Sequence, residues 1–179
     1  MDDFAKLATI IGGVATAVTV IITLVAIWHE SREARFSLNT ELLMKLQDQF
    51  EAPLMRASRK NAALALLDIL EKGQTSYNLG NLVRVLNFFE LVGWLWKRRA
   101  IDTNSTRVMF SYWYRLYWQA ITTPLPPCNL SYIEDAHREN PHLWIHAKNL
   151  AKIFIPTGHY PNLEDLKESL KDEANLTER

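Results

Sequence analysis

The chain has 179 residues, and its 20 basic residues balance its 20 acidic ones, so that its formal net charge at pH 7 is zero. This balance argues against a protein built mainly to neutralise nucleic acid, and we expect no nucleic-acid partner. The single cysteine, Cys128, excludes an intramolecular disulfide and a zinc site made of cysteines, and it fits a reducing compartment.

The first predicted element, after a short tail at residues 1–6, is a transmembrane helix at residues 7–28. These residues include no charged side chain. At about 1.5 Å rise per residue such a helix reaches roughly 33 Å, enough to cross a hydrocarbon core of about 30 Å. A cleaved secretory signal is not expected, because the start carries Asp2 and Asp3 instead of basic residues and the apolar run is too long.

The charges on either side of this helix predict its orientation. Lys6 alone precedes the span, whereas Arg32, Arg35 and Lys45 follow it closely. Because cytoplasmic flanks carry the excess of Lys and Arg, we expect the N-terminus outside and the C-terminal domain in the cytoplasm. The predicted location is the cell (inner) membrane, with a single pass through the lipid bilayer.

Small and hydroxylated residues form a seam along the predicted span. They follow alternating spacings of three and four residues, as the contact positions of a heptad do: Thr9, Gly12, Thr16, Thr19, Thr23 and Ala26. Such residues let membrane helices approach closely and hydrogen-bond across the contact, so we expect a homo-oligomer that forms through the anchor. The alternatives are threonines that bond to their own helix and a threonine-lined pore in a larger ring.

The rest of the chain is predicted to be all-α, a compact bundle of five or six helices. It shows no sustained alternation of apolar and polar residues and no Asn-Gly or Asp-Gly hairpin turn. We expect a juxtamembrane helical stalk at residues 29–52, a cytoplasmic helical domain at residues 53–174 and a frayed tail at residues 175–179.

Periodicity and capping residues predict the helices of this domain. Pro53 suits the first turn of a helix at 54–70, and Asn140-Pro141 looks like the cap and first turn of another helix that ends at Phe154. Ser131 and Glu134 have the spacing of a capping box. The remaining helices are expected at residues 79–99, 105–121 and 162–174.

The hairpin at residues 79–122 is the candidate site for a ligand or a protein partner. It holds four of the six tryptophans and an excess of positive charge, and the residues of interest are Arg84, Lys97, Arg98, Arg99 and Arg115. Basic and aromatic side chains together could stack bases and contact phosphates, or meet anionic lipid headgroups. We favour a simpler interpretation, in which the aromatics form the core and residues 97–99 are a solvated helix C-terminus.

Two further features concern chemistry. Glu90 lies in a strongly apolar stretch, and we expect a buried structural acid with a partner such as Arg115. His142 and His146 share a helix face, with His137 nearby, but the glutamate of an H-E-x-x-H zinc motif is missing. We expect no catalytic residue, no metal and no cofactor.

Several stretches of the chain resemble a known family. Residues 85–92 (VLNFFELV) and 97–102 (KRRAID), followed by Phe110 and Tyr117-Trp118, are similar to the core of the bacterial family called domain-of-unknown-function 4760. Residues 41–44 and 55–59 also fit that family. Its members are small uncharacterised proteins, often with an N-terminal membrane helix. The resemblance implies a single-pass topology and an all-α domain, and it supplies no catalytic residue.

Two functions are compatible with these features. We favour a membrane-anchored, self-associating helical interaction or sensing module without catalytic activity, in a setting such as bacterial stress or phage defence. The alternative is an enzyme or a nucleotide-ligand binder that uses the hairpin at residues 79–122. A pocket lined by Arg84, Glu90 and Arg115 would favour the enzyme, whereas a filled core would favour the module.

Overall fold

The computed structural model is all-α over the residues that it describes, which confirms the all-α part of the predicted fold class. The described residues are 23, 26, 28–30, 33–34, 36–72, 79–122, 139–140, 142–155 and 162–175, and none of them is in a strand. Most of the predicted span lies outside this set, as do Thr9, Gly12, Thr16 and Thr19 of the seam and the capping box at Ser131. Among the described residues, no helix combines the length and the apolar character needed to cross a membrane.

The chain divides into two units, Met1–Glu41 and Leu42–Arg179. Residues 42–51 are helical and contribute Leu43, Leu46 and Phe50 to the hydrophobic core. These residues were expected in the stalk. Their apolar face is instead buried, which makes them part of the helical domain.

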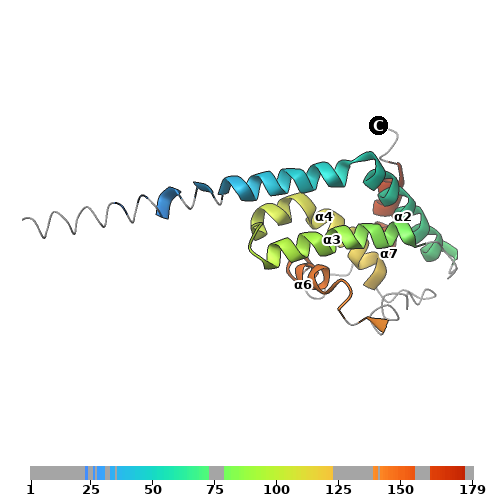
Figure 1. Cartoon of the computed structure of the whole chain (residues 1–179). Coiled ribbons are helices and arrows are strands. Elements are labelled where there is room, and N and C mark those ends of the chain that lie inside the picture. Colours follow the sequence, from blue (N-terminus) through green and yellow to red (C-terminus); the bar gives the residue numbers. More distant parts are fainter. Residues whose placement is uncertain are drawn as a thin grey trace, which may run out of the picture. The chain divides into compact units, whose positions relative to one another are not determined.

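Among the described residues, the second unit contains five further helices with complete bounds (Figure 1). They are α2 (Pro53–Lys72), α3 (Gly80–Lys97), α4 (Thr103–Thr122), α6 (Ile145–Phe154) and α7 (Leu163–Asn175). The most extensive helix–helix contacts are those of α3 with α6, of α2 with α7 and of α2 with α3. The start of α2 at Pro53 is the predicted one, because proline needs no backbone donor in a first helical turn.

Aromatic rings fill the centre of the bundle around Phe50. The Phe50 ring lies 4.8 Å from the Phe88 ring, 5.8 Å from Phe110 and 5.7 Å from Trp113, measured between ring centroids. The last turns of the helix that precedes α2 are therefore held by α3 and α4. Aromatic pairs at these separations stabilise a core beyond the area that they bury.

The helix α3 ends in a Schellman motif at Arg99. The Arg99 N–H donates to the Trp96 carbonyl at 2.9 Å, and the Ala100 N–H donates to the Leu95 carbonyl at 3.0 Å. This arrangement puts Arg99 in the left-handed region, at φ 58°. Glycine usually occupies such a position, and an L-residue there costs on the order of 1 kcal/mol. The chain therefore keeps a cation where glycine would be more stable.

The helix α6 starts later than the sequence predicted. Residues 142–144 form a turn, and Trp144 adopts the left-handed conformation at φ 52°, so the regular helix begins at Ile145 and not at Pro141. Trp144 is 2% exposed, and its indole N–H donates to Asn87 Oδ1 at 2.8 Å. Tertiary packing of this indole on α3 thus overrides the local signal of Asn140-Pro141.

Candidate functional site

The aromatic side chains of the α3–α4 hairpin mostly fill the interior. Tyr114 and Tyr117 are fully buried, and the Tyr114 hydroxyl donates to the Phe89 carbonyl at 2.6 Å. Trp94 and Tyr112, in contrast, are 42% and 46% exposed. The favoured sequence interpretation, a core, therefore describes most of these rings, and Trp94 and Tyr112 are the exceptions.

The five basic residues of the predicted site are all exposed, and side-chain contacts are described for Arg84, Arg98 and Arg115. Arg84 Nη1 donates to Ser58 Oγ at 2.9 Å, and Arg115 Nε donates to the Ser111 carbonyl at 3.4 Å. The Arg98 guanidinium lies 5.5 Å from the Trp94 ring centroid. Among the described residues, no contact joins Arg84 or Arg115 to Glu90.

Glu90 contacts the first turn of α6, and its described hydrogen-bond donors are backbone groups. Its Oε2 accepts hydrogen bonds from the backbone N–H groups of His146 at 2.9 Å and Ala147 at 2.8 Å, in the first turn of α6. The side chain is 26% exposed, so it is only partly buried. The first N–H groups of a helix lack intrahelical acceptors, and a carboxylate there also meets the positive end of the helix dipole. These backbone donors replace the arginine that we expected.

The same contact brings His146 toward Glu90. His146 Nε2 lies 4.0 Å from Glu90 Oε1, while His142 is exposed. His137 lies outside the described residues. In the part of the chain that the structure describes, no three His, Cys, Asp or Glu side chains come together as a metal site would need.

We expect Glu90→Ala to lower the free energy of unfolding by about 1–2 kcal/mol, because two N–H groups of α6 lose a charged acceptor. Glu90→Gln keeps an acceptor oxygen and should cost less. The measurement is urea unfolding of the full chain in detergent, followed by tryptophan fluorescence, with the exposed Glu168→Ala as control. A loss below about 0.5 kcal/mol would show that the cap is unimportant.

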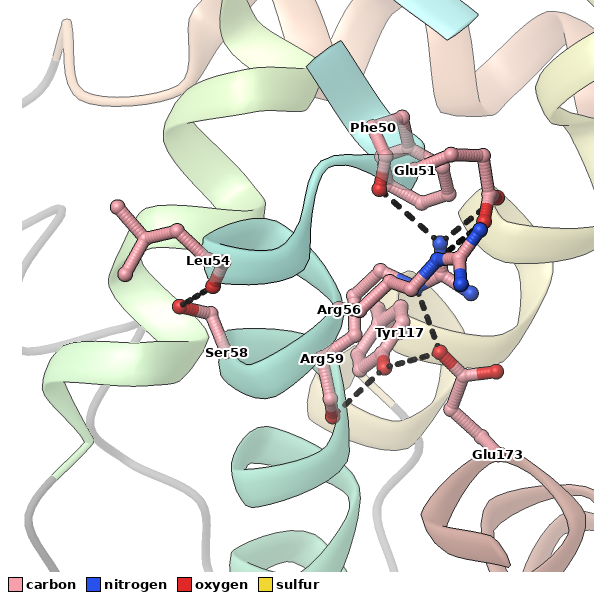
Figure 2. Close-up of polar contacts among 8 residues, drawn as sticks. All are labelled: Phe50, Glu51, Leu54, Arg56, Ser58, Arg59, Tyr117 and Glu173. Atoms are coloured by element: carbon pink, nitrogen blue, oxygen red, sulfur yellow. Dashed lines mark hydrogen bonds and ion pairs between the residues drawn. The ribbon is translucent and has the colours of Figure 1, made fainter. Parts of the chain in front are cut away.

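A buried polar network around Arg59 of α2 was not predicted (Figure 2). Arg59 Nε donates to Glu173 Oε1 of α7 at 2.6 Å. Its Nη1 donates to Glu51 Oε1 at 3.0 Å and to the Phe50 carbonyl at 3.2 Å. Arg59 is 5% exposed and Glu173 is 2% exposed. The network therefore joins α2, α7 and the end of the preceding helix through an internal ion pair.

Aromatic groups complete this network. The Tyr117 hydroxyl of α4 lies 3.0 Å from the Arg59 carbonyl and 3.3 Å from Glu173 Oε1, and it can donate to either acceptor. The Arg59 guanidinium lies 4.3 Å from the Phe50 ring centroid and 4.2 Å from that of Trp113. Desolvated cation–π contacts of this kind hold a guanidinium in place as well as stabilising it.

Burial and pairing act in opposite directions on the two charges. Burial disfavours the Arg59 cation, but its bonds to Glu173 and Glu51 outweigh burial and raise its pKa. Burial also disfavours the Glu173 carboxylate, and here it outweighs the bonds from Arg59 and Tyr117, so the pKa of Glu173 is raised as well. Of the two shifts, the raised pKa of Glu173 determines how the ion pair responds to pH, because Glu173 Oε2 is buried and has no described hydrogen-bond partner.

Sequence reasoning missed this network because its members are far apart. Arg59 and Glu173 are 114 residues apart, and no local spacing connects them. One signal was available: Glu173 follows Leu166 by seven residues and Leu170 by three, which puts the carboxylate on the apolar face of α7. A charge on that face needs a buried partner, although the sequence does not identify Arg59 as that partner.

No family model, curated protein or solved structure matches this chain. The likeness of residues 40–121 to the bacterial family of unknown function thus stays a proposal. The fold and the site define a class only: an all-α helical bundle closed by an internal ion pair.

Proposed function

We propose that this chain is a single-pass protein of the bacterial inner membrane with its N-terminus outside and its helical domain in the cytoplasm. It self-associates through its anchor and offers the helical domain to a protein partner as an interaction or sensing module without catalytic activity. The observation that carries the proposal is the uncharged run at residues 7–28, which has the length of a membrane span.

The roles of the acidic side chains support a module over an enzyme. Glu173 pairs with Arg59 inside the bundle, and Glu90 caps α6. Both groups stabilise the fold, whereas a catalytic acid needs a second reacting group within hydrogen-bond reach and access for a substrate. The filled core of the α3–α4 hairpin points the same way.

The alternative is an enzyme or a nucleotide-ligand binder at residues 79–122. One observation favours it, namely the exposed Trp94 ring with the Arg98 guanidinium 5.5 Å from its centroid. An exposed ring beside a cation can stack a base. Isothermal titration of the full chain with nucleotides would detect such binding, and a saturable signal lost in Trp94→Ala would favour this function.

The anchor seam provides the main test of the proposal. We expect Gly12→Leu with Thr16→Leu to weaken self-association while insertion survives, because added bulk separates the helices but keeps the span apolar. Steric packing should dominate, since interhelical hydrogen bonds average only about 0.6 kcal/mol. The measurement is crosslinking of the full chain in membranes. Val14→Leu with Val18→Leu is the matched control, and equal association in both pairs would make the anchor a simple tether.

Orientation and insertion are tested separately. A cytoplasmic reporter fused after Arg179 should be active and a periplasmic one silent. Alkaline extraction should leave the chain in the membrane fraction. Release of the chain by alkali, or the reverse reporter result, would contradict the proposed membrane topology.

A further inference from the structure

The corner between α3 and α4 carries an exposed aromatic and basic surface. We call the surface formed by Trp94, Lys97, Arg98 and Arg99 the α3–α4 corner. All four side chains are exposed, and the Arg98 guanidinium lies 5.5 Å from the Trp94 ring centroid. The proposed function assigns no role to these four side chains, and they are not part of the hydrophobic core.

The charge of the corner is not balanced within the described part of the chain. None of its three cations has an ion-pair partner among the described residues. The nearby acid, Asp102, serves the start of α4, where its Oδ1 accepts the Ser105 N–H at 2.9 Å. The corner therefore exposes three positive charges and one indole that a binding partner could contact.

Helix electrostatics account for only part of this pattern. Cations in the last turn of a helix interact favourably with its dipole, which is reason enough for Lys97 and Arg98. Arg99 differs, because it lies past the end of α3 in the left-handed region, at φ 58°. A strained residue kept at a surface suggests a functional reason for its side chain.

The position of the corner in the bundle indicates its partner. In Figure 1 the helix that precedes α2 runs in the same direction as α4, and α3 runs in the opposite direction. The turn between α3 and α4 thus lies at the end where the chain enters the bundle from its N-terminal side. The corner therefore lies at the end of the second unit from which the chain leads back, along the sequence, toward the predicted span.

We propose that the α3–α4 corner binds the anionic headgroups of the inner leaflet and so holds the helical domain against the bilayer. This inference rests on the proposed membrane anchor. Lys and Arg near an anionic surface are attracted to it, each by about five-fold in binding, so three cations shift the equilibrium on the order of one-hundred-fold. The indole of Trp94 suits the headgroup level, where one side is apolar and the other is wet.

The test uses the full chain in nanodiscs, with Cys128→Ser and a single fluorescent label at Ala100→Cys. The quencher is a lipid that carries a nitroxide on its headgroup. We expect strong quenching in discs that contain phosphatidylglycerol, and weak quenching in discs of phosphatidylcholine alone or at high salt. A label at Thr122→Cys, at the other end of the roughly 30 Å long α4, should stay unquenched in both.

Charge variants separate the corner from the general charge of the domain. Lys97→Gln with Arg98→Gln should reduce the quenching to the level in phosphatidylcholine. Lys148→Gln with Lys152→Gln removes the same charge from α6 and should leave the quenching unchanged. Arg99→Gly should weaken the quenching without lowering the unfolding temperature, because glycine relieves the backbone while the cation is lost. A purely structural role for Arg99 predicts no loss of quenching.

Two outcomes would overturn the inference while the anchor stands. In the first, the chain resists alkaline extraction, but the label at position 100 is quenched equally in discs with phosphatidylglycerol and in discs of phosphatidylcholine alone. The other is a label that stays unquenched in anionic discs while the corner binds a labelled oligonucleotide, which would identify a soluble polyanion as the occupant. Extraction of the chain by alkali is a different result, because it contradicts the proposed function itself.

Discussion

Replacing Glu173 with alanine is expected to lower the free energy of unfolding by about 3–5 kcal/mol, because it removes one partner of a buried ion pair. Among the described residues, Arg59, 5% exposed, would keep only Glu51 as a counter-charge, and the Glu51 side chain is 38% exposed. Tyr117 would also lose an acceptor within 3.3 Å. Since Glu51 still compensates in part, we expect a value near the lower end of that range.

The measurement is urea unfolding of the full chain in detergent. Glu168→Ala is the matched control, because Glu168 lies exposed on the same helix, and it should change the free energy of unfolding by less than about 0.5 kcal/mol. A loss below about 1 kcal/mol in Glu173→Ala would mean that the ion pair does little to hold α7 on α2.

The same carboxyl should make stability depend on pH. Its folded-state pKa is raised above the ordinary value of 4.5, so the folded chain binds this proton more readily than the unfolded chain does. The resulting stabilisation is fully present below pH 4.5 and is lost as the pH rises through the folded-state pKa. Glu173→Gln should remove this part of the pH dependence. The difference between the unfolding curves of wild type and variant, measured from pH 4 to pH 8, isolates it.

A methyl group at Gly93 is expected to destabilise the chain by about 2–3 kcal/mol or more, as overpacking of a core does. In Gly93→Ala the added Cβ would lie 2.5 Å from the carbonyl carbon and oxygen of His146 and 2.9 Å from the Ala147 nitrogen. These are backbone atoms, so α3 and α6 must move apart. The movement would also stretch the bonds from Glu90 to the first turn of α6.

The sign of this effect makes it a sharp test. Helix propensity alone predicts that Gly→Ala within a helix stabilises by about 1 kcal/mol. A stabilised Gly93→Ala would therefore show that the two helices are not held this close. Leu91→Ala is a control on the same helix, because Leu91 is 38% exposed and its truncation leaves the contact of α3 with α6 intact. Hydrogen exchange at the His146 and Ala147 amides reports on the contact directly.

Features with local signals could be predicted from the sequence, and features that depend on distant groups could not. Pro53 marks the start of α2 because proline has a fixed preference for a first turn. The partner of Glu90 was missed because backbone amides 56 and 57 residues away carry no side-chain signal. The start of α6 was missed because a buried Trp144 holds a left-handed conformation that no local rule predicts.

The candidate site also had features that the local sequence could predict and features that depend on distant groups. Composition identified the basic residues 97–99, and the structure places them on the surface. It could not show that Arg99 follows the end of α3 in a left-handed conformation, because that depends on the Schellman hydrogen bonds. The ion pair of Arg59 with Glu173 needed the whole fold, since only the packing of α7 on α2 brings the two charges together.

The separation of Arg59 from Glu173 also sets an order of events during synthesis. A ribosome that adds 5–20 residues per second needs roughly 6–23 s to travel the 114 residues between them. Throughout that interval Arg59 has no Glu173 to pair with, and α2 lacks the helix that covers it. The domain therefore completes its fold after translation has passed α7, and a nascent chain that stalls before α7 exposes the surface of α2 that α7 would bury.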